Sequence, residues 1–125
     1  MKDHTLRGNL DGADDILRHF PTLLRRWDGS IARMWTLTTS HRTLVLRLEQ
    51  NGRVGNLQIA CIEPEFIHGP TEWWDSHIEI ERHANGFVVK DERAGLEVHT
   101  GHVELAENRK PLNVFTLDAT SGKTG

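Results

Sequence analysis

The 125-residue chain contains one cysteine, no tyrosine and no apolar run long enough to span a bilayer. The single cysteine, Cys61, excludes an internal disulfide and favours a reducing, intracellular compartment. Residues 1–12 lack the apolar core of a secretion signal. We therefore expect a cytoplasmic protein that does not enter a membrane.

The chain also lacks an excess of positive charge. Its net charge is −3, its basic residues are dispersed, and the absence of tyrosine leaves no evident stacking platform for bases. These features disfavour nucleic acid as a partner. With 37% hydrophobic and 26% charged residues, the composition is that of a globular protein, and its length fits one domain.

The sequence holds no H-E-x-x-H, C-x-x-C or G-x-S-x-G motif. The C-terminal SGKTG resembles the end of a phosphate-binding loop, but Leu117 stands where the first glycine is required. Cys61 alternates with Leu57 and Ile59, which indicates a buried structural thiol. No catalytic set and no cofactor site are indicated, which favours a non-enzymatic role.

Residues 11–29 predict an N-terminal amphipathic helix. Its apolar residues recur at helical spacing. They are Ala13, Ile16, Leu17, Phe20, Leu23, Leu24 and Trp27. Pro21 conflicts with an uninterrupted helix, so either the helix kinks there or Pro21 begins a second short helix.

After Gly29 the apolar period changes to two, which is typical of strands. The predicted strands are 31–38, 43–49, 56–63, 76–83, 87–92 and 96–105, with 111–117 as a candidate seventh. One helix, about 10 Å wide, is too narrow to cover a flat sheet of strands about 4.8 Å apart. The predicted fold is therefore α+β, with one N-terminal amphipathic helix packed on a curled antiparallel meander sheet of six to seven strands, like a half-barrel. We expect a flexible arm at 1–10, one domain at 11–117 and a frayed polar tail at 118–125.

Turn residues predict the strand register. A turn at Ser40–His41 and another at Asn51–Gly52 place the apolar residues of the first three strands on one face. The predicted cross-strand pairs are Leu37–Leu44, Trp35–Leu46, Leu46–Leu57 and Leu44–Ile59. We expect the helix to pack on the leucines and the isoleucine of this face.

The segment EWWDSHIEIERH, residues 72–83, places His77, Glu79, Glu81 and His83 on every second position. His77 and His83 would lie about 20 Å apart in a strand, so they cannot share one metal. Turns at Asn85–Gly86 and Ala94–Gly95 would instead align three carboxylates across neighbouring strands. Glu79, Glu92 and Glu97 are weak candidates for a divalent-cation site. Screening by water and salt is the preferred reading, and we expect no metal.

The connection at 64–72, followed by two tryptophans, is the most apolar loop of the chain. We expect a partner or ligand surface there, formed by Phe66, Ile67, His68, Trp73 and Trp74. Strand alternation predicts that Trp73 points outward and Trp74 inward, although both rings could instead fold over the end of the core.

Two functions are compatible with these features. The first is a binding or assembly module that acts as a homo-oligomer, namely a dimer, or through a protein partner. The alternative is a small-ligand pocket or simple enzyme within the curled sheet beneath the helix. That pocket would be lined by four residues that strand alternation places on the same face as the apolar side chains. They are Arg33, Trp35, Arg82 and Asp91.

Overall fold

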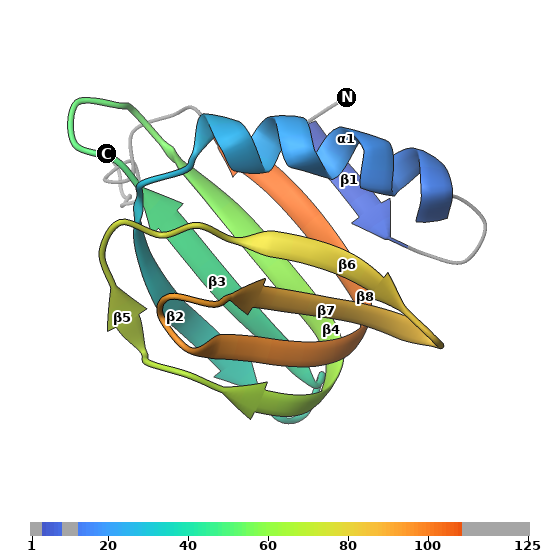
Figure 1. Cartoon of the computed structure of the whole chain (residues 1–125). Coiled ribbons are helices and arrows are strands. Elements are labelled where there is room, and N and C mark those ends of the chain that lie inside the picture. The colour runs from blue at the N-terminus through green and yellow to red at the C-terminus, as the bar shows by residue number, and fades with distance from the viewer. Residues whose placement is uncertain (1–3, 9–12, 109–125) are drawn as a thin grey trace, which may run out of the picture.

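The computed structural model describes residues 4–8 and 13–108, with side chains from residue 19 onward. The elements in chain order are β1 (His4–Gly8), α1 (Ala13–Arg26), β2 (Ile31–Thr38), β3 (Thr43–Glu49), β4 (Asn56–His68), β5 (Glu72–Trp73), β6 (Glu79–His83), β7 (Gly86–Asp91) and β8 (Leu96–Asn108). In these ranges the strands form one antiparallel sheet with the order β5-β2-β3-β4-β8-β7-β6, and β1 pairs with β8. The sheet curls into a half-barrel with one helix packed on it (Figure 1), so the α+β class is confirmed.

Residues 4–8, which we expected to lie in a flexible arm, form β1. They pair with β8 from Gly8 opposite Val103 to His4 opposite Glu107. The same part of β8 pairs with β4 on its other side. The candidate strand at 111–117 and the tail at 118–125 lie outside the described residues.

Helix α1 is one continuous element that passes through Pro21. Phe20, Leu23, Leu24 and Trp27 of the predicted stripe are all buried. The helix lies against β1 and β6 (Figure 1). Its C-terminal end is fixed to β8, because the buried Glu107 carboxylate accepts hydrogen bonds from Trp27 Nε1 at 2.7 Å and Arg26 Nη1 at 2.7 Å. No helix in the described residues is long and apolar enough to cross a membrane.

The register between β2 and β3 contains a bulge. Leu37 lies opposite Leu44 as predicted, but Met34 rather than Trp35 lies opposite Leu46. The bulge between Met34 and Thr36 shifts the alternation by one residue. Leu37, beside the turn that ends β2, is 56% exposed, so the prediction that it belongs to the helix-covered core is wrong.

The register between β3 and β4 differs by two residues from the prediction. Leu46 lies opposite Ile59 and Leu48 opposite Leu57, because the connection extends from Gln50 to Gly55 rather than closing at Asn51–Gly52. A shift by two leaves every side chain on its predicted face. Leu44, Leu46, Leu57 and Ile59 are therefore buried together, as expected.

The hairpin between β6 and β7 turns at Ala84–Asn85 rather than at Asn85–Gly86. Gly86 is already in β7, and a Cβ atom there would lie 2.3 Å from the carbonyl oxygen of Thr100. The glycine therefore permits close approach of β7 to β8, while Ala84 takes the positive φ of 41° in the turn.

The expected loop at 64–72 is partly strand. β4 continues to His68 along β8, and Glu72 and Trp73 pair with β2 as β5. Residues 74–78, here called the strap, then connect β5 at one end of the sheet order to β6 at the other. The Trp73 side chain is buried in the interior. Its Nε1–H donates a hydrogen bond to Asp91 Oδ2 at 2.9 Å, which links β5 to β7.

Candidate binding groove between the helix and the edge strand

A groove of about 390 Å³ runs between the C-terminal half of α1 and strand β6. Its lining comes from the helix, the strap and β6. The lining residues are Phe20, Pro21, Leu24, Arg25, Asp28, His77, Ile78, Glu79, Ile80 and Glu81. The groove is thus bounded by two elements that lie far apart in the sequence.

The floor of the groove is apolar. Phe20 and Leu24 come from the buried stripe of α1, four residues apart and therefore on one face of the helix. Ile78 and Ile80 alternate with outward-facing glutamates, so their side chains point toward the helix and join the core. Hydrophobic side chains can therefore be accommodated in the groove.

Within residues 4–8 and 13–108, strand β6 ends the sheet order and pairs only with β7. The two-residue turn makes His83 and Gly86 a hydrogen-bonded pair, as in other tight hairpins. By alternation, the backbone N–H and C=O of Ile80 point away from β7. Among the turn, loop and cap hydrogen bonds of the described residues, none involves the backbone of Ile80. β6 is therefore an edge strand that lies beside the groove.

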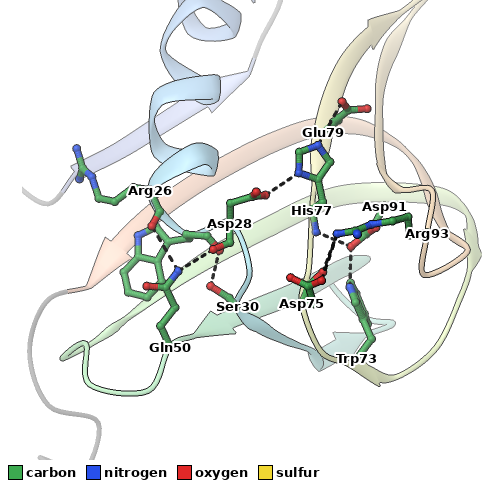
Figure 2. Close-up of polar contacts among 11 residues, drawn as sticks. Arg26, Asp28, Ser30, Gln50, Trp73, Asp75, His77, Glu79, Asp91 and Arg93 are labelled. Atoms are coloured by element: carbon green, nitrogen blue, oxygen red, sulfur yellow. Dashed lines mark hydrogen bonds and ion pairs between the residues drawn. The ribbon is translucent and has the colours of Figure 1, made fainter.

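A histidine bound to an aspartate forms one end of the groove. His77 Nδ1 lies 2.7 Å from Asp28 Oδ1, and His77 Nε2 lies 3.8 Å from Glu79 Oε2 (Figure 2). Asp28 follows α1, and its carbonyl oxygen accepts from Gln50 Nε2 at 3.1 Å. The imidazole consequently lies between two carboxylates.

The strap that carries His77 is held by backbone and buried polar contacts. Gly29 N donates to Ser76 O at 2.7 Å, and Ser76 N donates to Ser30 O at 3.0 Å. Asp91, which is almost completely buried, accepts from His77 N at 2.7 Å through the same Oδ2 atom that binds Trp73 (Figure 2). These contacts fix the position of His77 at the groove.

The hydroxyl groups of this region do not favour nucleophilic chemistry. Ser30 and Ser76 are both buried, and Ser30 Oγ donates to the carbonyl oxygen of Trp27. Neither of these two serines is open to a substrate, so neither hydroxyl can act as a nucleophile beside His77.

The rim and outer face near β6 carry an excess of negative charge. Asp28, Glu79 and Glu81 line the groove together with one guanidinium, that of Arg25. On the outer face, Lys90 Nζ lies 2.9 Å from Glu81 Oε2 and 3.4 Å from Glu92 Oε2. The hydrogen bond with Glu81 is the main reason that the pKa of Lys90 is raised.

The predicted carboxylate row is not formed. Lys90 lies opposite Glu79 on one side and opposite Glu97 on the other, because both hairpins are shifted by two residues from the predicted register. Glu92 lies in the turn between β7 and β8. No group of three potential metal ligands occurs in the part of the chain that the structure describes.

The predicted partner surface is divided. Phe66 is 49% exposed on β4, and Trp74 is 67% exposed on the strap, whereas Trp73 is only 6% exposed. The prediction for the two tryptophans is therefore wrong, because β5 places Trp73 opposite Ala32 with its ring in the core. His68 and Ile67 are exposed at the end of β4, and His68 Nδ1 contacts Gly95 O at 3.1 Å.

The four residues of the alternative pocket have separate environments. Arg33 Nη1 and Nε pair with Glu49 at 2.6 Å and Glu72 at 2.8 Å, and Trp35 stacks on the guanidinium of Arg47 at 4.1 Å.

Arg82 is exposed on β6, opposite Phe87, while Asp91 is buried beside Trp73. The bulge in β2 explains why Arg33 does not join the predicted lining. It shifts the alternation by one residue, so the Arg33 side chain lies on the opposite face of the sheet from the one predicted. These four residues do not form one lining.

The contact between Asp28 and His77 and the groove beside it are not predictable from the sequence pattern. The two residues are 49 positions apart, and their contact depends on the path of the strap. The periodicity of the helix and of β6 indicates an apolar face on each element, but not that the two faces lie together. Comparison of the chain with protein-family models, curated proteins and solved structures finds no match.

Proposed function

We propose that this protein is a binding module that takes an extended polypeptide segment along β6, in the groove beneath α1. The observation that carries the proposal is the open edge of β6 beside an apolar floor. An exposed strand edge offers main-chain hydrogen bonds to an added strand, and neighbouring pockets then select its side chains. The groove provides both features.

A library of eight-residue peptides, titrated into isotopically labelled protein, tests strand addition. Bound peptides should shift the amide resonance of Ile80 and slow its hydrogen exchange. The variant Ile80→Pro removes the N–H that points away from β7, at an edge position where proline is tolerated, and should abolish binding. Ile80→Ala retains the N–H and is the matched control, which should keep part of the affinity.

Two results would contradict strand addition. One is the failure of every peptide in the library to bind at millimolar concentration. The other is binding that leaves the resonances of β6 and α1 unchanged and persists in Ile80→Pro. Either result would remove the groove as a polypeptide site.

Self-association is a second candidate, which the exposure of Trp74 and Phe66 supports. Large exposed aromatic side chains are common at the centre of protein interfaces. Sedimentation of the wild type and of Trp74→Ala tests this candidate. It requires a wild-type dimer at micromolar concentration that dissociates in Trp74→Ala, and a monomeric wild type would exclude it.

A further inference from the structure

We infer that the segment bound at β6 has a basic–apolar–basic pattern, with its apolar residue in the groove and its two basic residues beside Glu79 and Glu81. This inference rests on the proposed strand addition and assigns the chemistry of the ligand. Its basis is the alternation of β6, in which the exposed Glu79 and Glu81 flank Ile80 of the groove floor.

An added strand must follow the faces of the strand that it joins. Directly opposite residues of neighbouring strands point to the same side of a sheet. The ligand residue opposite Ile80 therefore points into the groove, toward Phe20 and Leu24, which are buried apolar side chains of α1. An apolar side chain at this position would bury its surface, whereas a charged one would lose its hydration.

The two flanking ligand residues point to the outer face, where carboxylates outnumber cations. Glu79 and Glu81 are about half exposed, at 52% and 51% of their side-chain surface. Lys90 lies opposite Glu79 and Glu97 and within 4 Å of Glu81 and Glu92, so four carboxylates surround one lysine. Two basic side chains from a ligand would offset this excess.

The helix dipole favours a ligand of net positive charge, although α1 lies on the groove side of β6 and not on its outer face. The C-terminal end of α1 lies at the groove, and the helix dipole favours positive charge there. Arg25 opposes it, since its guanidinium also lines the groove, but Asp28, Glu79 and Glu81 outnumber it three to one. The field at the rim thus favours a cationic ligand.

Fluorescent peptides with the sequence Thr-Thr-Lys-Val-Lys-Thr-Thr, and the same peptide with glutamate for lysine, serve as probes. We expect the lysine peptide to bind about tenfold or more tightly than the glutamate peptide at low salt, with a difference that shrinks as salt is added. Glu79→Lys should remove this preference. Glu65→Lys makes the same change of charge on exposed β4 and should leave it intact.

The outcomes separate the inference from the proposed function. Equal binding of both peptides, abolished by Ile80→Pro, would overturn the charge pattern and support strand addition. A lysine preference that is lost equally in Glu65→Lys would reflect net charge alone and would overturn the inference. A dimer of the protein that the peptide dissociates would identify a second copy as the occupant and would also overturn it.

Discussion

At the scale of single residues, Trp73 and Trp74 are neighbours in the chain but differ tenfold in exposure, at 6% and 67%. Trp73 fills the interior and donates to Asp91, so Trp73→Ala should cost about 3–5 kcal/mol in the free energy of unfolding. Trp74→Ala should change it by less than about 0.5 kcal/mol. Urea unfolding of both variants measures the difference. Equal losses would mean that the path of β5 is wrong.

Cys61 is completely buried, and burial raises the pKa of its thiol to about 12. A thiol reagent reacts with the thiolate and needs access to it. Native protein at pH 8 should therefore react only at the rate of unfolding, while protein in 6 M guanidinium should react at once. Rapid labelling of the native state with Ellman's reagent would show that the reagent reaches Cys61 in the folded protein, and that this side chain of β4 is not buried.

Glu97 has a lowered pKa, mainly because its carboxylate is hydrogen-bonded to His99 at 2.5 Å. A lowered folded-state pKa contributes stability above the unfolded pKa, and this contribution disappears as the pH falls through the folded value. The wild type should therefore melt at a higher temperature than Glu97→Gln at pH 6. The gap should close below about pH 4.5, near the ordinary value for glutamate. A gap that persists at pH 2.5 would exclude this carboxylate as its source.

At the scale of elements, the helix stripe connects the sequence most directly to stability. Leu24 is 8% exposed, belongs to the core and also lines the groove. Leu24→Ala should cost about 2–5 kcal/mol as a core truncation. Arg25→Ala, on the exposed side of the same turn, is the control and should cost less than about 0.5 kcal/mol. If Leu24→Ala lowers the free energy of unfolding by less than about 0.5 kcal/mol, the apolar face of α1 is exposed to solvent rather than packed in the core.

The approximate positions of six strands and most buried faces could be predicted from the sequence, but β1, β5 and the strand registers could not. The period of two places Leu44, Leu46 and Ile59 on one face, and this result is unchanged when a strand slides by two residues. Only the length and position of the turn determine by how many residues two neighbouring strands are offset. Asn85–Gly86 was misleading because Gly86 is needed for the approach of Thr100 rather than for the turn.

The candidate site could be predicted only in part. The apolar faces that form its floor follow from the helix stripe and from the alternation of β6, both of which are local patterns. The contact of His77 with Asp28 and the burial of Trp73 depend on where residues 72–78 cross from one end of the sheet to the other. Local periodicity contains no information on that crossing, so the directions predicted for Trp73 and Trp74 were wrong, and the partner surface itself stays a prediction.

At the scale of the whole molecule, the strap brings the two ends of the sheet order together. Asp91 of β7 accepts from Trp73 of β5 and from His77 of the strap. Ser76 adds two backbone hydrogen bonds to residues 29 and 30, which lead into β2. Within the residues that the structure describes, the half-barrel is thus closed by a few polar contacts around one buried carboxylate rather than by a continuous ladder between β5 and β6.

Asp91→Ala should open this closure. The variant leaves the Trp73 indole N–H and the His77 amide N–H without their acceptor, and each buried unpaired donor costs about 1–3 kcal/mol. Hydrogen exchange should therefore accelerate at Ser76 and His77 by more than the global loss of stability explains, because the strap opens before the sheet does. Asp75→Asn, which changes an exposed strap residue, should leave these amides protected. Uniform acceleration across the sheet in Asp91→Ala would show that the strap and the sheet open as one unit, and the groove beside β6 would then be as rigid as the core.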